Sequence, residues 1–294
     1  MTSEDTESMR EALAALSRAP ALKTSFGIER LTVRADLWEE RLVVRGAGTS
    51  SLSTLRSFGD ASGEAIGRFQ SRLADARVDD ILRAVNATLS GGPAASLSPG
   101  DVRVLITVVA CGSKLVHVVG GGPEHLEPYT QLLAVLDQVA FEARKRPVCT
   151  LQLEAELPAT TAPSASIPVV LTFVNNGGEG AWIRNPAAGM EDTPAEHVRL
   201  WYAQVQPEQP GVTPLPMEPE SVPLEPALRV QRPLLWLGSG ESEARQFSAQ
   251  LSLDPGTYLM RASFASYAGV DTVAGHNLLR GCVFSQEQTV EVRG

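Results

Sequence analysis

The hydrophobic pattern of the chain changes at Pro147, and this change limits the possible folds more than any other feature. Before Pro147, several segments carry apolar residues at helical spacing, interrupted by pairs of alternating segments. After Pro147 the helical spacing disappears, and short alternating segments follow one another between turns rich in proline and glycine. The 294 residues also exceed what a single core usually needs. We therefore expect two domains of different class.

The part before Pro147 predicts an α+β domain, an antiparallel sheet with helices on one face. Two predicted hairpins, over residues 29–46 and 101–119, are each followed by helix, which gives this architecture most simply. Helices are expected over residues 4–18, 63–76, 79–89 and 126–146. The last of them carries a predicted buried stripe of Leu132, Leu136, Val139 and Ala143. We assign residues 1–20 to an N-terminal helix and 21–147 to the α+β domain.

The part from residue 148 to 294 predicts an all-β immunoglobulin-like sandwich. Half-buried strands are expected over 149–157, 167–176, 197–206, 245–253, 256–266 and 281–292. Residues 207–233 hold eight prolines and predict an extended, exposed excursion from one edge of the sandwich. A ligand for a proline-recognition domain is the alternative interpretation of this stretch.

The net charge of -9 lies almost entirely on the second half of the chain. Residues 1–146 hold 17 basic and 18 acidic side chains, and the rest holds 8 and 16. Because an acidic domain repels phosphate backbones and anionic lipids, we expect neither nucleic acid nor a membrane as partner. The acidic N-terminal segment differs from a signal peptide, no apolar run reaches about 18 residues, and three cysteines make no disulfide framework. A cytoplasmic location is expected.

The stretch "ACGSKLVHVVGGGPEH", residues 110–125, is the first place to look for chemistry. A type II′ turn at Gly112 and Ser113 would pair Cys111 with Lys114. Cys111 and His117 would then project from opposite faces of the hairpin and could not form a catalytic pair. We expect no catalytic residue here, although a hydrolase that uses Cys111 or a carboxylate pair is the competing hypothesis.

Metal and cofactor motifs are weak throughout the sequence. The four candidate ligands Cys111, His117, His125 and Cys149 lack the close pairing of zinc sites. The glycine run after the hairpin lacks the G-K-[ST] ending of a phosphate loop, and G-x-S-x-G does not occur. We therefore predict no metal site and no cofactor. Three aromatic residues could form a sugar platform or pack in the sandwich core: Trp201, Tyr202 and Trp236.

Two resemblances to known families add to this interpretation. Residues 24–146, with "ERLTVRAD", "GEAIGRFQSRL" and "DVRVLITVVACGSKLVHVVGGG", resemble the bacterial ββαββα modules that include emfourin, an inhibitor of a metalloprotease. The part from Cys149, with "IPVVLTFVNNG" and "LSLDPGTYLMRASF", is similar to immunoglobulin-like domains such as the BsuPI intracellular proteinase inhibitor. The resemblances imply these two folds and leave function open, since both folds serve unrelated binding tasks.

Taken together, the sequence predicts a non-enzymatic, cytoplasmic binding protein whose partner is another protein. A protease is one candidate partner, with this chain as its inhibitor or regulator. In an immunoglobulin-like order, the loops 175–182 and 267–281 should emerge at the same end of the sandwich. Aromatic and arginine side chains dominate binding energy at interfaces, so the predicted partner-binding residues are Trp182, Arg184, His276 and Arg280. Core packing is the alternative role of Trp182.

Overall fold

The computed structural model describes most of the chain, which clusters into two compact units. The described residues are 3–34, 37–55, 65–88, 103–120, 129–188, 197–205, 219–266 and 278–294. Unit 1 comprises residues 1–54 and 68–148, and unit 2 comprises residues 55–67 and 149–294. Unit 2 thus takes in a short segment from the first part of the chain, in addition to the strands that follow residue 148.

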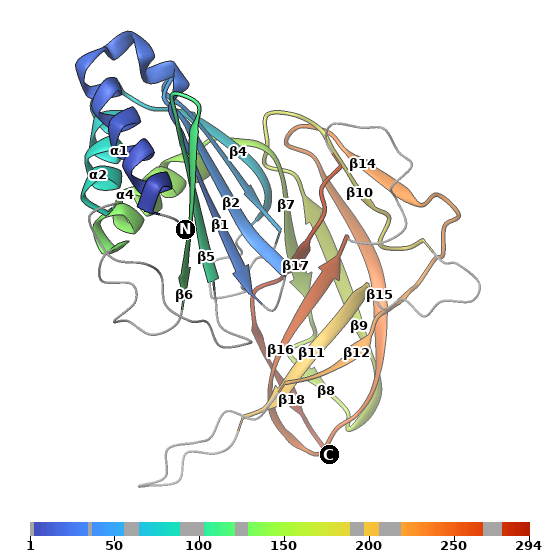
Figure 1. Ribbon diagram of the computed structural model, residues 1–294. Helices are drawn as coiled ribbons and strands as arrows, with labels where there is room; N and C mark the ends of the chain where they lie inside the picture. The colour runs from blue at the N-terminus through green and yellow to red at the C-terminus, as the bar shows by residue number, and fades with distance from the viewer. Residues whose placement is uncertain are drawn as a thin grey trace, which may run out of the picture. The chain divides into compact units, whose positions relative to one another are not determined.

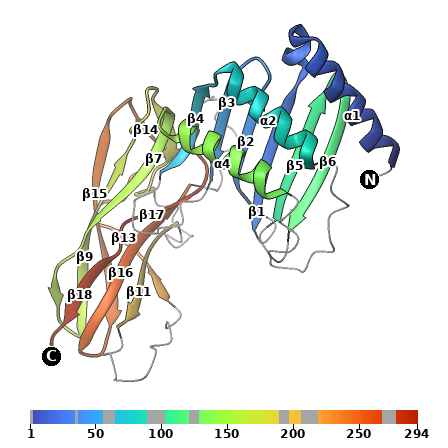
Figure 2. The ribbon, with the colours of Figure 1, turned by 90° about the vertical axis from the view of Figure 1, so that its left-hand side faces the viewer.

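Unit 1 is an antiparallel sheet covered on one face by helices, as Figure 2 shows. Its strands stand in the order β4-β3-β2-β1-β5-β6. They are β1 (Gly27–Arg34), β2 (Leu37–Arg45), β3 (Thr49–Thr54), β4 (Ile66–Arg72), β5 (Arg103–Ala110) and β6 (Ser113–Gly120). The helices are α1 (Ser3–Arg18), α2 (Asp75–Thr88) and α4 (Thr130–Arg144), with the short 3-10 helix η1 (Pro20–Ser25) after α1.

The core of unit 1 lies between the sheet and these helices. The predicted stripe of α4 is buried throughout, because Leu132, Leu136, Val139 and Ala143 all face the sheet. Met9, Leu13 and Leu16 of α1 join the same core. The sheet contributes alternate residues of its strands, such as Leu42 and Val44 of β2. The helix predicted over residues 79–89 is also present, as α2.

The helix predicted over residues 63–76 is wrong, because residues 66–72 form the strand β4. Ile66, Phe69 and Leu73 are spaced like one face of a helix. However, Ile66 is buried in the core of unit 2 and Phe69 in the core of unit 1. These apolar residues therefore do not form one buried face of a helix. The chain passes from unit 2 to unit 1 within a strand, after Gly67.

Unit 2 is a β-sandwich of two main sheets with an additional two-stranded sheet. One main sheet has the order β13-β15-β9-β7, the other has the order β12-β11-β16-β18-β8 with β17 paired to β16, and β10 pairs with β14. The strands are β7 (Pro147–Glu156), β8 (Thr160–Thr161), β9 (Ser164–Val174), β10 (Ala181–Arg184), β11 (Val198–Gln204), β12 (Glu220–Pro223), β13 (Glu225–Pro226), β14 (Leu234–Leu237), β15 (Ser242–Ser252), β16 (Gly256–Ala265), β17 (Cys282–Phe284) and β18 (Gln288–Val292). Figure 1 shows the strands from β7 to β18 in yellow-green to red.

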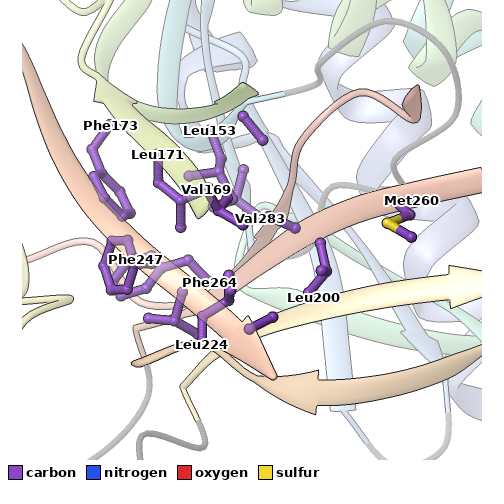
Figure 3. Packing of buried hydrophobic residues seen from close by; sticks show 14 of the residues in the cluster. Leu153, Val169, Leu171, Phe173, Leu200, Leu224, Phe247, Met260, Phe264 and Val283 are labelled. Atoms are coloured by element: carbon purple, nitrogen blue, oxygen red, sulfur yellow. The ribbon is translucent and has the colours of Figure 1, made fainter. Parts of the chain in front are cut away.

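The core of unit 2 lies between the two main sheets. Phe173 of β9 and Phe264 of β16 meet edge to face, with ring centroids 5.1 Å apart, and both rings are fully buried. Figure 3 shows them among the aliphatic side chains that fill the same space, including Leu171 and Leu200. Alternate residues of β9 are buried along its length, as the sequence pattern predicts for a half-buried strand.

The proline-rich excursion predicted for residues 207–233 is only partly an excursion, because residues 220–226 include two short edge strands, although Glu220, Pro223 and Glu225 are exposed as predicted. Here β12 and β13 pair with strands of the two opposing sheets, and Leu224 between them is fully buried. Pro223 and Pro226 are tolerated because both strands are edges, where a missing N–H disrupts no interior ladder. Residues 206–218 lie outside the described residues.

The fold is mostly β, and it contains the large antiparallel sheets that the sequence predicted. The predicted strand 281–292 is interrupted after Phe284, where Ser285 contacts the backbone of β16 instead. Within the described part of the chain, every helix is too short or too polar to span a bilayer.

Candidate functional site

Two tryptophans face each other across the small sheet of β10 and β14. Trp182 and Trp236 are direct cross-strand partners, with ring centroids 5.0 Å apart and ring planes inclined by 56°. Ala181 and Ile183 on the opposite face of β10 are fully buried. The outer face is different, because Trp182 is half-buried and Trp236 remains 45% exposed. The pair therefore forms an aromatic surface on an otherwise well-packed strand pair.

The segment at residues 278–280 lies beside β10, on the side away from β14. Leu278 forms a parallel bridge with Trp182, and the N–H of Leu279 donates to the carbonyl oxygen of Trp182 at 2.9 Å. The side chain of Leu279 is buried, whereas Arg280 is exposed. Since side chains alternate along an extended segment, Arg280 projects to the same side as Trp182.

The hydroxyl group of Ser266 fixes the spacing of these two segments. Its Oγ accepts from the N–H of Arg184 at 3.0 Å and donates to the carbonyl oxygen of Leu279 at 2.9 Å. Ser266 is itself buried. The hydroxyl group of Ser266 thus satisfies one backbone donor and one backbone acceptor, next to the direct hydrogen bond between Leu279 and Trp182.

The loop that leads into β10 is held by one buried side chain, that of Asn175. This residue is fully buried at the end of β9, and its amide group has no free hydrogen-bonding capacity. Its Oδ1 accepts from the backbone N–H groups of Thr150 and Gly177. Its Nδ2 donates to the carbonyl oxygens of Glu179, Leu237 and Gly238. The loop, the start of β7 and the end of β14 are therefore tied to a single point.

Gly180 provides the space that the aromatic surface needs. A Cβ atom at this position would lie 2.1 Å from Cζ2 of Trp236, well inside van der Waals contact. Only glycine lets the indole of Trp236 rest on the backbone just before β10. The position of this ring is thus fixed from below by Gly180 and from the side by Trp182.

Arg184, at the end of β10, lies close to a buried histidine. His197 is 7% exposed, and its Nε2 lies 3.3 Å from the carbonyl oxygen of Pro186, which places the ring proton on Nε2. Burial lowers the pKa of His197 to about 4, with a further contribution from the positive charge of Arg184. The imidazole is therefore neutral at physiological pH and serves structure rather than charge.

The structure brings three of the four predicted partner-binding residues together. Trp182, Arg184 and Arg280 lie on adjacent segments, whereas His276 lies outside the described residues. The prediction that Trp182 belongs to a loop is wrong, since the loop ends at Gly180 and Trp182 is in β10. A purely core role for Trp182 also fails, because its ring is only half-buried.

Sequence reasoning missed Trp236 as the partner of Trp182. The sequence analysis groups Trp236 with Trp201 and Tyr202, but these two residues belong to β11 and make other contacts. Trp201 donates from Nε1 to Ser263 at 2.8 Å, and Tyr202 donates to Glu220 at 2.7 Å. As neighbours on β11 they point to opposite faces, which excludes a common platform of all three rings. The sequence signal for Trp236 was the apolar run "LLWL" before Gly238, which is too short for a periodic pattern.

The hairpin at residues 103–120 places Cys111 and His117 in different surroundings. Cys111 is exposed in the turn, with its Sγ 3.4 Å from the Oγ of Ser25. His117 is buried, and its Nδ1 lies 2.9 Å from the hydroxyl group of Tyr129. Burial lowers the pKa of His117. His125 lies outside the described residues.

The predicted turn of this hairpin is wrong by one residue. Cys111 and Gly112 are its central residues, both with positive φ, and Ala110 pairs with Ser113. Positive φ at both positions is typical of a type I′ turn, which matches the right-handed twist of a hairpin as the predicted type II′ turn also would. Lys114 therefore pairs with Val109 and not with Cys111.

No protein-family model and no curated protein matches the sequence. Among solved structures, the chain is similar to the CARDB domain of the PF1109 protein from Pyrococcus furiosus, solved with di-metal ions. The identity is 15%, over 50% of this chain and 91% of that domain, with a TM-score of 0.24. It is also similar to AvmM, which catalyses macrocyclization in alchivemycin A biosynthesis, at 13% identity over 49% of this chain and 92% of AvmM, with a TM-score of 0.23.

A third similar structure is the alkylpurine DNA glycosylase AlkC of Pseudomonas fluorescens bound to DNA with an abasic site analog. The identity is 9% over 59% of this chain and 40% of AlkC, with a TM-score of 0.27. Similarity at this level assigns the chain to no family. The sandwich of unit 2 is established by the pairing of its own strands.

Proposed function

We propose that the chain is a non-enzymatic, cytoplasmic protein that binds another protein through the surface around Trp182 and Trp236. The observation that carries this proposal is the tryptophan pair itself, exposed on one side and packed on the other. Large aromatic rings that a protein could bury but leaves at its surface are typical of binding sites. The finer assignment of the two units, an α+β domain and an immunoglobulin-like sandwich, belongs to the same proposal.

The rigidity of the backbone supports a binding role for this surface. The side chain of Asn175 ties the loop before β10 to two other segments, and Ser266 fixes the segment of Arg280. A preformed surface loses little conformational entropy when a partner binds, so more of the contact energy appears as affinity. The indole rings are therefore presented in one arrangement, as a specific protein interface requires.

The chemistry of the surface indicates the kind of partner. Arg184 and Arg280 flank the tryptophans on a domain that is acidic as a whole. Arginine forms strong paired hydrogen bonds with carboxylates, so the matching patch of the partner should combine an apolar centre with acidic side chains. A protease is the partner class that we propose, with this chain as its inhibitor or regulator.

Co-purification from the source cells tests the proposal. The unchanged chain should recover a partner that is lost with Trp182→Ala or Arg280→Ala. Phe141→Ala is the matched control, because it removes another exposed aromatic ring, on α4 of unit 1. Equal recovery with the unchanged chain and both site variants would overturn the binding surface. If the recovered protein is a protease, its rate of peptide hydrolysis with and without the chain decides whether the chain inhibits it.

A further inference from the structure

Unit 1 has a cavity lined by arginine and hydroxyl side chains that has no part in the surface proposed above. Its volume is about 570 Å³, within the range of small-molecule sites. Three arginines from three separate segments line it: Arg45 at the end of β2, Arg72 at the end of β4, and Arg146 after α4. The remaining lining residues are Val43, Thr49, Ser50, Ser51, Gln70 and Ser71.

Among the described residues, none of the three arginines has an acidic partner. The lining contains no aspartate or glutamate, and within the described part of the chain none of the three guanidinium groups makes an ion pair. Other arginines of the same unit are paired, such as Arg30 with Glu40 and Arg41 with Glu29. Three positive charges around one cavity repel one another, and a bound anion would remove that repulsion.

The backbone at each arginine is fixed by hydrogen bonds to its neighbours. The N–H of Gly48 donates to the carbonyl oxygen of Arg45, and the N–H of Leu73, next to Arg72, donates to the carbonyl oxygen of Gly48. The N–H of Gln70 donates to the carbonyl oxygen of Arg146 at 3.1 Å. The three segments are therefore held together whether or not a ligand is bound.

The turn between β2 and β3 is also locked from its other side. The N–H of Gly46 donates to the carbonyl oxygen of Phe26, and a Cβ atom at residue 46 would lie 1.7 Å from the carbonyl oxygen of Lys23. Gly48 has a φ of 77°, a left-handed conformation that favours glycine. This turn presents Arg45 and Thr49, direct partners in the ladder of β2 and β3, at the rim of the cavity.

We propose that this cavity binds a small ligand that carries a phosphate monoester. A phosphate dianion matches several guanidinium groups better than a single carboxylate does, because it carries more charge and more acceptor oxygens. The hydroxyl groups of Thr49 and Ser51 add donors for the same ligand. The limited volume and the absence of a longer basic stripe along this lining favour a small molecule over a nucleic acid.

Isothermal titration of the full chain with inorganic phosphate and with ribose 5-phosphate, at constant ionic strength, tests the proposal. We expect saturable binding, with a dissociation constant for ribose 5-phosphate below about 1 mM. Each of Arg45→Gln, Arg72→Gln and Arg146→Gln should weaken it about tenfold or more, as expected for a lost charge-assisted hydrogen bond. These side chains are exposed, so the variants should fold.

Arg83→Gln is the matched control. Arg83 is an exposed arginine of α2 outside the cavity, so this variant removes the same charge and should bind within about twofold of the unchanged chain. Equal weakening by Arg83→Gln would show general charge attraction and overturn the site. Absence of saturable binding, or tighter binding of citrate than of ribose 5-phosphate, would overturn the phosphate assignment. If a single-stranded oligonucleotide binds more tightly than ribose 5-phosphate, with a steep salt dependence, the ligand is a nucleic acid and the small-molecule assignment is overturned.

Discussion

Gly180 lies directly beneath the indole of Trp236, where a Cβ atom would come within 2.1 Å of the ring. Gly180→Ala should therefore displace Trp236, disturb its contact with Trp182 and lower stability by about 1–3 kcal/mol through overpacking. Near-ultraviolet circular dichroism reports the tryptophan environment, and urea unfolding reports stability. Gly27→Ala is the control, because a Cβ atom there meets only the carbonyl oxygen of Val44, at 3.7 Å. Unchanged spectra for both variants would contradict the packing of Gly180 and Trp236.

Asn175→Ala should destabilise unit 2 strongly. It removes the acceptor of two buried N–H groups and the donor to three carbonyl oxygens, and we expect a loss of about 2–4 kcal/mol. The neighbouring variant Asn176→Ala removes one exposed hydrogen bond to Gln152 and should cost less than about 0.5 kcal/mol. Urea unfolding of the two variants provides the comparison. Similar losses in both would show that the buried network does not hold the loop.

His197 should make unit 2 less stable in mild acid. Burial and the charge of Arg184 lower the folded-state pKa of His197 to about 4, whereas its value in the unfolded chain is close to 6.5. Between these two values the unfolded chain takes up a proton that the folded chain does not, so the free energy of unfolding falls as the pH falls. The full effect is about 3 kcal/mol.

His197→Gln tests this linkage, because glutamine keeps a donor for the carbonyl oxygen of Pro186 but does not titrate. Urea unfolding at a series of pH values from 7.5 to 4.5 should therefore give a shallower acid slope for the variant. The carboxylates and His117 contribute equally to the pH dependence of both proteins. Their contribution therefore cancels when the two slopes are compared. Identical slopes would refute a depressed pKa at His197.

Glu40 should contribute to the stability of unit 1 through a buried cation. Arg30 is 6% exposed and donates to Glu40 at 2.5 Å and to Asp137, while Arg144 also contacts Glu40. Glu40→Gln removes the best-buried negative charge of this group and should cost about 1–3 kcal/mol in chemical unfolding. Glu142→Gln, which affects an exposed pair with Lys145, should cost less than about 0.5 kcal/mol. Equal losses of stability in Glu40→Gln and Glu142→Gln would contradict this role of Glu40.

Periodicity predicted the strands of the sandwich and the stripe of α4 because each of these elements buries one continuous face. It failed for β4, where Ile66 and Phe69 are buried in two different cores and imitate the spacing of a helix. It also could not choose the hairpin register. The predicted and observed pairings differ by two residues along one strand, so every side chain keeps its face, and only the positive φ of Cys111 distinguishes the turns.

The composition of the candidate site and the shared end of its loops were predictable from the sequence, but the contacts that hold the site together were not. Trp182, Arg184 and Arg280 were predicted from their residue types and from an immunoglobulin-like strand order. Their proximity depends on Leu278 lying beside β10, a contact between residues almost a hundred positions apart that no local pattern encodes. Trp236 was missed as the partner of Trp182 for the same reason, since β14 has four residues and forms a two-stranded sheet with β10.

The affinity of the recovered partner for Trp236→Ala tests the central claim most directly. Trp236 was not among the partner-binding residues predicted from the sequence, and its ring is 45% exposed beside Trp182. If the tryptophan pair is the binding surface, titration of purified partner should show affinity weakened about thirtyfold or more, and Phe141→Ala should leave it within about twofold. Affinity within about twofold of the unchanged chain for Trp236→Ala, with the fold intact by circular dichroism, would contradict the account.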